Sequence, residues 1–230
     1  MTTETISVII PVYNGARFLG EAIQSVLDQT ATAAELIVVD DGSTDDSRVV
    51  AAAYPGVRLV SKAHSGVAAT LNVGVAHTTG RFLAFLDADD RWLPEKLARQ
   101  LAALRSDPGL AIVFGHCRRF RMTADTQPRE EMLDVIPGIS KAAMLVRREA
   151  FLRVGGFTED AGAHEFLDWY ARAGEAGLRT ALLPDILYER RIHDENMGVV
   201  GRADQQSSYF VSLRHKLDRQ RVRSAASGTG

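Results

Sequence analysis

The sequence predicts a single α/β domain in which helices flank a mostly parallel sheet. Short, continuous apolar runs recur along the first half of the chain, as strands buried on both faces require. Helix-length segments separate these runs, and polar residues follow several of them directly. Such alternation is typical of a parallel sheet covered on both sides. The five expected strands span residues 6–10, 36–39, 57–60, 82–86 and 110–114.

Four helices are expected between these strands. Residues 16–28 place their apolar side chains on one helical face. Residues 43–46 read as a capping box that opens the next helix. Further helices are predicted over 66–76 and 94–104, the latter with a proline in its first turn.

The second half of the chain is less regular. Residues 122–138 are polar and contain two prolines, which predicts a loop. The small, polar residues 224–230 predict a disordered tail after a domain that spans 1–223. Short strands are expected at 142–146, 181–183 and 186–188, and helices at 149–154 and 164–176.

Composition excludes several classes of protein. The net charge is −2, with 27 basic and 29 acidic residues, so the basic surface of a nucleic-acid binder is not expected. No run of about 18 apolar residues predicts a transmembrane helix. The polar N-terminus does not resemble a secretory signal. Cys117 is the only cysteine, which excludes an internal disulfide. We expect a cytoplasmic protein, and peripheral contact with the inner membrane face stays compatible with the sequence.

Polar side chains follow three of the expected strands at the point where each strand ends. In an open α/β sheet, ligands bind at the carboxyl ends of the strands. A cluster of carboxylates at that edge repels itself unless a cation or hydrogen-bond donors neutralise it. An Asp-x-Asp pattern suits a hard divalent ion such as Mg²⁺ or Mn²⁺. The side chains concerned are Pro11 and Tyr13 after the first strand, Asp40 and Asp41 after the second, and Asp87, Asp89 and Asp90 after the fourth.

Each of these features also has a simpler structural explanation. Asp41 precedes a glycine and could only form a turn, and Asp45 and Asp46 could only cap a helix. Tyr13 alone is more often a packing residue than a stacking one. The shared placement at one edge of the sheet is what favours a binding site.

Three segments, residues 7–14, 36–45 and 85–90, resemble the family-2 glycosyltransferases of GT-A fold. The helix after the third strand and the Gly-Gly-Phe segment at 155–157 are similar as well, so the resemblance extends to about His193. It implies a Rossmann-like sheet, with a nucleotide-binding half over about 1–115 and an acceptor-binding half over 116–223.

The resemblance also implies a reaction. A sugar would pass from a nucleotide-diphosphate donor to an acceptor hydroxyl with inversion, and Mn²⁺ or Mg²⁺ would stabilise the leaving diphosphate. The acceptor would be a carbohydrate or a lipid-linked molecule in cell-surface polysaccharide or glycoconjugate synthesis. A uridine or thymidine donor is favoured, because the Asp41 carboxylate would accept the N–H of the base and Tyr13 would stack on it.

Site residues follow from the same resemblance. Those expected to bind the nucleotide are Pro11, Val12, Tyr13, Asp40, Asp41, Ala69, Asp87 and Ala88. Asp89 and His193 are expected at the metal. His193 ends an Arg-Arg-Ile-His segment similar to a late family motif, whereas outside that motif it would be a surface histidine. Asp90, Arg191 and Trp169 are expected near the diphosphate or the acceptor. His64 and His164 have no motif in support and are expected at the solvated rim.

Two positions depart from the family pattern. Leu71 stands where an arginine is common, and Phe166 stands where the acceptor-side helix commonly has an aspartate. The catalytic base is therefore open between Glu165 and Asp168. Asp168 ranks slightly ahead, because its neighbour Trp169 suggests a sugar-facing surface.

Two other functions stay open at this stage. A nucleotidyltransferase would use a similar sheet and metal, but it normally has a glycine-rich, arginine-containing loop after the first strand, and the loop here has one glycine. A sugar-nucleotide-binding module without turnover would explain the altered acceptor helix.

Overall fold

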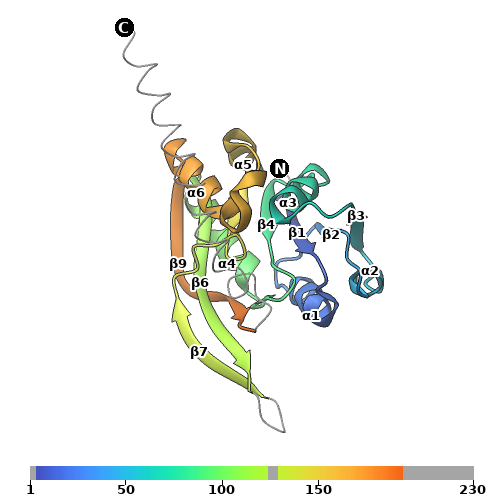
Figure 1. Ribbon diagram of the computed structural model, residues 1–230. Coiled ribbons are helices and arrows are strands. Elements are labelled where there is room, and N and C mark those ends of the chain that lie inside the picture. The colour runs from blue at the N-terminus through green and yellow to red at the C-terminus, as the bar shows by residue number, and fades with distance from the viewer. Residues whose placement is uncertain (1–3, 124–128, 194–230) are drawn as a thin grey trace.

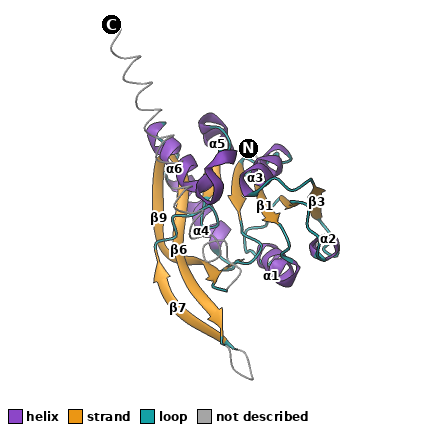
Figure 2. Ribbon diagram, viewed as in Figure 1, coloured by secondary structure: helices purple, strands orange, loops and turns teal. Residues whose placement is uncertain are grey.

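The computed structural model describes residues 4–123 and 129–193, without the side chains of 162 and 163, and Figure 1 shows its helices and strands. The expected tail at 224–230 lies outside the described residues, and so do residues 194–223 of the expected acceptor-binding half. Figure 2 shows one continuous sheet with helices packed around it, which confirms the α/β class.

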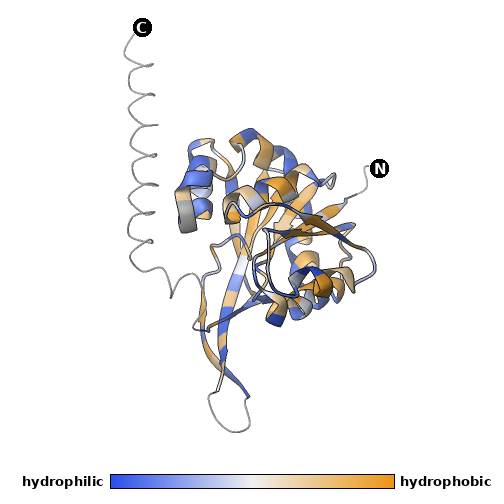
Figure 3. Cartoon of the chain, turned by 45° about the vertical axis from the view of Figure 1, so that its right-hand side comes forward, coloured by the Kyte–Doolittle hydropathy of each residue, from blue (hydrophilic) through white to orange (hydrophobic). Residues whose placement is uncertain are grey.

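The first four strands form the parallel part of the sheet, in the order β3-β2-β1-β4. Their residues are almost entirely apolar and buried, apart from those of the edge strand β3. Figure 3 shows this concentration of hydrophobic residues in the centre of the sheet. The bounds are Ile6–Val12 for β1, Glu35–Asp40 for β2, Val57–Ser61 for β3 and Phe82–Phe85 for β4. Each lies within two residues of the sequence prediction.

Helices cover both faces of this part of the sheet. Figure 1 shows α1 and α3 on opposite sides of β1. Gly74 of α3 allows a close approach, because a Cβ there would lie 2.4 Å from Cγ2 of Ile9 on β1. The bounds are Ala16–Leu27 for α1, Ser47–Ala52 for α2, Val67–Ala76 for α3 and Lys96–Ser106 for α4.

The second half of the sheet is mixed rather than parallel. Strand β8 (Leu145–Arg147) runs antiparallel to both β4 and β6 (Leu110–Met122), while β6 and β9 (Arg179–Arg191) are parallel to each other. The two short strands predicted at 181–183 and 186–188 belong to β9, whose pairing with β6 shifts register in between. The remaining elements are β5 (Arg91–Trp92), α5 (Arg148–Val154), the 3₁₀ helix η1 (Glu159–His164) and α6 (Glu165–Glu175).

The loop predicted over 122–138 is wrong at residues 130–136. Residues Glu130–Ile136 form β7, which pairs antiparallel with β6. Six of its seven residues are exposed, so an apolar alternation could not reveal it. Cross-strand ion pairs stabilise the hairpin instead: Arg121 Nε lies 2.7 Å from Glu131 Oε2, and Arg119 pairs with Asp134.

Within residues 4–123 and 129–193, no helix has the length and apolar character needed to cross a bilayer.

Candidate active site

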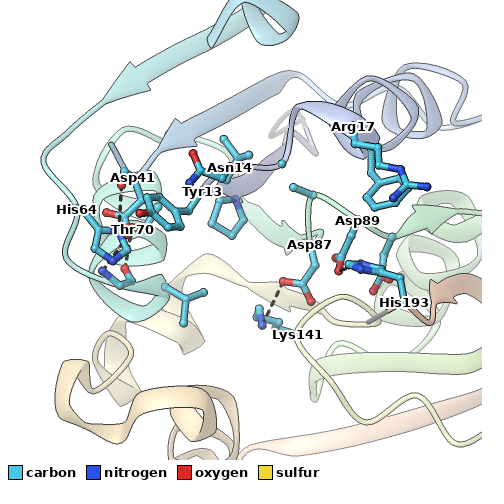
Figure 4. Close-up of a pocket in the computed structure, with 18 of the residues that line it drawn as sticks. Tyr13, Asn14, Arg17, Asp41, His64, Thr70, Asp87, Asp89, Lys141 and His193 are labelled. Atoms are coloured by element: carbon cyan, nitrogen blue, oxygen red, sulfur yellow. Dashed lines mark hydrogen bonds and ion pairs between the residues drawn. The ribbon is translucent and has the colours of Figure 1, made fainter. Parts of the chain in front are cut away.

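A pocket of about 630 Å³ opens at the carboxyl ends of β1, β2 and β4. It is the edge at which the sequence predicted a binding site, and α6 and the end of β9 close its far side. Figure 4 shows Tyr13, Asp41 and His64 at one end and Asp87, Lys141, Asp89 and His193 at the other. The predicted residues that line the pocket are Pro11, Val12, Tyr13, Asp41, Asp87, Ala88, Asp89, Asp90, Glu165 and His193.

The loop after β1 is held by side chains from the loop after β2. Asn14 adopts a left-handed backbone conformation (φ 51°), and its Oδ1 accepts the Thr44 N–H at 2.8 Å. Ser43 Oγ in turn accepts the Asn14 N–H at 2.9 Å. Asp45 Oδ2 accepts the Ala16 N–H at 2.9 Å and so caps α1. The capping box predicted at 43–46 does not form, because Asp46 at the start of α2 makes no capping hydrogen bond through its side chain. Asp45 Oδ1 instead accepts the Ser47 N–H at 3.0 Å.

Asp41 is surrounded by donors. Its Oδ1 accepts hydrogen bonds from the Lys62 ammonium and from the Ser65 N–H at 2.9 Å, and its Oδ2 accepts the Gly66 N–H at 2.9 Å. His64 Nδ1 lies 3.0 Å from Oδ2. Burial alone would raise the pKa of Asp41, but the hydrogen bonds from Lys62 and the two backbone N–H groups outweigh it and lower that pKa. Asp41 is therefore an ionised anchor for residues 62–66.

An aromatic pair stands at this end of the pocket. The rings of Tyr13 and His64 lie 4.1 Å apart between centroids, with an interplanar angle of 32°. Tyr13 is half exposed, so the pair presents a surface on which a planar group could stack. His64 lines the pocket with a side chain that is 56% exposed, so it lies at the solvated rim, as expected.

At the other end, one lysine joins two carboxylates. Lys141 Nζ lies 3.1 Å from Asp87 Oδ1 and 3.0 Å from Glu165 Oε1. The Glu165 side chain is 3% exposed, and its Oε2 has no hydrogen-bond partner within the described part of the chain. Burial would lower the pKa of Lys141, but the charges of Asp87 and Glu165 raise it well above its usual range. Lys141 is thus a permanent cation in the pocket.

Asp89 and His193 lie together on the floor of the pocket, with His193 Nε2 3.1 Å from Asp89 Oδ2. The Phe18 ring packs 5.0 Å from the imidazole. Asp90 is buried below them and accepts the Arg191 N–H at 3.0 Å. Burial and the neighbouring charges of Asp89 and Asp87 raise the pKa of Asp90 well above its usual range.

The donor set of Asp89 and His193 fits a divalent ion. No three metal-ligating side chains gather around one point among the residues described. Mg²⁺ and related ions, however, commonly take one or two protein ligands and complete their shell with water and substrate phosphates. A carboxylate and an imidazole that open onto a pocket match that arrangement, and imidazole is an acceptable ligand for Mn²⁺.

Five of the predicted residues do not line the pocket. Asp40 is fully buried beneath the loop after β2, where its Oδ1 accepts the Ser43 N–H at 3.2 Å. Ala69 is buried in α3. Arg191 points under the Asp-x-Asp loop, where it donates to the Asp89 carbonyl at 3.2 Å, and Arg190 lines the pocket in its place. The other two, Asp168 and Trp169, lie on α6.

The placement of Asp168 and Trp169 corrects the expectation that they face the substrate. Asp168 Oδ2 accepts a hydrogen bond from Thr158 Oγ1 at 2.6 Å and from Arg172 Nε at 3.0 Å, and its side chain is fully buried. Trp169 stacks on Phe151 and donates from Nε1 to the Gly155 carbonyl at 2.9 Å. Of the two acids proposed as base, only Glu165 reaches the pocket.

Asn72 and Leu71 of α3 do not line the pocket. Asn72 Nδ2 donates to the Phe157 carbonyl, and Asn72 Oδ1 accepts the Phe157 N–H, both at 2.8 Å. This pair ties α3 to the segment that leads into η1 and α6. Leu71 is fully buried in the core.

The sequence prediction missed the cations of the pocket. Lys141 and Arg17 lie in no recognised motif, and Arg190 was passed over for its neighbour. With Arg190 and Arg17, Lys141 offsets the acidic residues along the same wall. Alternation along a strand that ran to His193 would put Arg191 and His193 on one face. Because β9 ends at Arg191, this signal selected the wrong arginine, and Arg190 lines the pocket with His193.

Comparisons with known proteins identify the family of the chain. Residues 7–160 match the sequence profile described as glycosyl transferase family 2. An uncharacterized glycosyltransferase of Nostoc is 48% identical over 99 residues, which cover 41% of this chain and 31% of that protein. Chondroitin synthase of Pasteurella multocida is 27% identical over 94% of this chain and 24% of its own length. The chain thus spans a third or less of these two relatives.

Solved structures show the same fold. TarS of S. aureus in complex with UDP superposes with a TM-score of 0.67 at 22% identity, over 83% of this chain and 61% of that one. A mannosyltransferase from Pyrobaculum calidifontis, in complex with GDP-Man and Mn²⁺, reaches 0.71 at 23% identity, over 93% and 65%. With the profile match over residues 7–160, the chain belongs to glycosyl transferase family 2.

Proposed function

We propose that this protein transfers a sugar from a nucleoside-diphosphate sugar to an acceptor hydroxyl, with inversion and with the help of a divalent ion. The observation that carries the proposal is the composition of one pocket. It contains an aromatic pair at the end of β1, an Asp-x-Asp segment at the end of β4, and the buried carboxylate of Glu165 on α6.

Within this proposal, the nucleotide occupies the end of the pocket at Tyr13 and His64. The base would stack on the aromatic pair, while Asp41 fixes the loop that carries His64. If Nδ1 of His64 donates to Asp41, Nε2 is left as an acceptor for an N–H of the base. Asp41 itself does not serve as the expected acceptor, because Lys62 and the N–H groups of Ser65 and Gly66 already occupy its carboxylate. Uracil and thymine offer an N–H to His64 instead, and we keep a uridine or thymidine donor as the proposal.

The diphosphate would lie over Asp89 and His193. A bound Mn²⁺ or Mg²⁺ would stabilise the negative charge that develops on the leaving diphosphate. Asp89 and His193 would hold the ion, and Arg17 and Arg190 line the same pocket as additional cations.

Glu165 is the proposed general base. Its Oε2 is buried and lacks a partner within the described residues, so it can accept the proton of the acceptor hydroxyl. As that oxygen bonds to the anomeric carbon, the bond to the diphosphate breaks. Attack from the face opposite the leaving group inverts the anomeric centre. Glu165 comes from α6, whereas Asp89 follows β4, so the proposed base and the proposed metal ligand reach the pocket from different elements, and this arrangement supports the proposed course.

We further propose a carbohydrate or lipid-linked acceptor, as in the synthesis of a cell-surface polysaccharide or glycoconjugate. The similarity to a chondroitin synthase over 94% of the chain supports this class.

A donor panel tests the proposal. UDP-, dTDP- and GDP-sugars are incubated with the protein, Mn²⁺ and a set of mono- and oligosaccharides, and the release of nucleoside diphosphate is measured. We expect release from at least one donor, its loss in chelator, and an inverted anomeric configuration in the product. Tight donor binding without release from any donor would indicate a binding module, and pyrophosphate release from a nucleoside triphosphate would indicate a nucleotidyltransferase.

A further inference from the structure

Lys141 is held in place from both sides. It opens a turn before β8 that is closed by a hydrogen bond from the Met144 N–H to the Lys141 carbonyl at 3.1 Å. The residue before it, Ser140, bonds the Tyr188 hydroxyl at 3.0 Å, and the carbonyl of Ala142, the residue after it, accepts a hydrogen bond from Trp92 Nε1 at 3.0 Å. These contacts fix the backbone from which the lysine side chain reaches the pocket.

The Lys141 side chain is 12% exposed and ends between two carboxylates from different parts of the fold. Asp87 follows β4 on the donor side, and Glu165 begins α6 on the acceptor side. One ammonium group therefore connects the two walls, at 3.1 Å and 3.0 Å. In the described ranges, no other cationic side chain forms an ion pair with either carboxylate.

The two oxygens of Glu165 differ sharply. Oε1 contacts Lys141, whereas Oε2 is buried with no hydrogen-bond partner in the described part of the chain. Leaving a buried polar atom unpaired costs about 1–3 kcal/mol, so such atoms in native structures call for a specific explanation. A substrate group that donates a hydrogen bond to Oε2 would supply it.

We propose that Lys141 is the positioning residue of the proposed transfer reaction: it fixes Glu165 through Oε1, so that Oε2 faces the acceptor hydroxyl, and it ties Glu165 to the donor-side Asp87. This inference rests on the proposed function. Lys141 does not itself accept a proton, because it stays charged. Its loss would leave donor binding largely intact and would misplace the base.

The main test is Lys141→Met, which keeps the length of the side chain and removes its charge. We expect kcat to fall about tenfold to a hundredfold, as for a catalytic group displaced by about 1 Å. We expect the KM for the donor, and the Kd for its nucleoside diphosphate measured by calorimetry with Mn²⁺, to change less than threefold. Lys141→Arg restores a cation and should recover part of kcat.

Lys96 provides a matched control. It is a second buried lysine, on α4, which donates to Gln100 Oε1 at 2.8 Å and to the Met144 carbonyl in the turn that follows Lys141 at 3.4 Å, but it does not line the pocket. Lys96→Met should change the melting temperature and leave kcat and KM near the wild-type values. This control separates the general effect of removing a buried lysine from the specific effect of removing Lys141.

The outcomes distinguish the inference from the proposed function. If Glu165→Gln is inactive while a folded Lys141→Met keeps the full kcat, the role of Lys141 is wrong and the function stands. If Glu165→Gln is also fully active, the assigned base is wrong. Should Lys141→Met fail to fold, Lys141→Gln and Lys141→Arg provide the test, and equal kcat in wild type and both variants would contradict the inference.

Discussion

Two buried carboxylates at opposite ends of the pocket show how differently the same chemical group can be used. The Asp41 carboxylate accepts hydrogen bonds from three donors, the Lys62 ammonium and the backbone N–H groups of Ser65 and Gly66, and His64 Nδ1 lies 3.0 Å from it. Glu165 is equally buried, but among the described residues its carboxylate is paired only with Lys141, and one of its oxygens has no hydrogen-bond partner there. A carboxylate whose two oxygens both accept hydrogen bonds holds a loop in place. A carboxylate with one oxygen that lacks a partner retains the capacity to accept a proton.

Glu165→Gln should produce the largest effect. The amide keeps the shape of the side chain but cannot accept the proton, so the transfer rate should fall by roughly 10²–10⁴-fold. Donor affinity, measured by calorimetry, should stay near the wild-type value. Full activity in a variant that binds the donor would remove Glu165 from the reaction.

Asp89→Asn should have the next largest effect. The contribution of a catalytic metal is several kcal/mol, so we expect a loss of about 10²–10³-fold at limiting Mn²⁺. Because the Asp89 side chain is about one-third exposed, the melting temperature should change little. A wild-type rate across a Mn²⁺ titration would show that Asp89 is not a required ligand.

Asp168→Asn, one helical turn from Glu165, should affect stability instead of turnover. The carboxylate satisfies Thr158 and Arg172, and Arg172 also donates to the carbonyls of Val154 and Gly156. Weakening this buried network should lower the free energy of unfolding by about 1–3 kcal/mol, which urea denaturation measures. A stable protein with a strongly reduced kcat would return the base to Asp168.

Tyr13→Ala tests the end of the pocket that holds Asp41. Loss of one stacking surface for a base costs about 1–3 kcal/mol, or roughly 5- to 150-fold in the Kd of a nucleoside diphosphate. Leu152→Ala, at an exposed position on α5 outside the pocket, is the control for Tyr13→Ala.

Competition among UDP, dTDP and GDP for the wild-type protein tests which base is bound. A clear preference for GDP would overturn the proposed uridine or thymidine donor.

Glu35 is another carboxylate that accepts several hydrogen bonds, and it does not line the pocket. Its substitution should have the smallest effect. It accepts hydrogen bonds from Ser7 and from the N–H and hydroxyl of Thr79. Burial would raise its pKa, but these bonds lower it from 4.5 to about 2. The folded pKa is the lower one, so this stabilisation is complete above about pH 4.5 and is lost as the pH falls through about 2.

Urea denaturation of Glu35→Gln should therefore differ from wild type at pH 7 and approach it as the pH falls towards 2. A constant difference across this range would mean that Glu35 stabilises the fold without its charge.

The sequence predicted the donor half well, because buried parallel strands and short loops leave a strong local pattern. Tyr13, Asp41 and Asp87 could be placed at one edge from strand order alone. Lys141 could not, because a single lysine in an irregular segment carries no periodicity. The ranking of Asp168 failed because Trp169 was taken to face the sugar, whereas α6 buries both.

The strand β7 escaped prediction for a related reason. Its residues are exposed on both faces, and ion pairs with β6 replace the apolar alternation from which a strand is recognised. The parallel pairing of β6 and β9 is likewise a long-range contact with no local signature.

Calorimetry of UDP, dTDP and GDP binding, with Mn²⁺ and again with chelator, tests the central claim most directly. The pocket places the aromatic pair and the Asp89–His193 pair on one continuous surface, so the account predicts that at least one nucleotide binds with Mn²⁺ and loses most of its affinity without it. Equal affinity in chelator, or no binding of any nucleotide in the presence of Mn²⁺, would contradict the account.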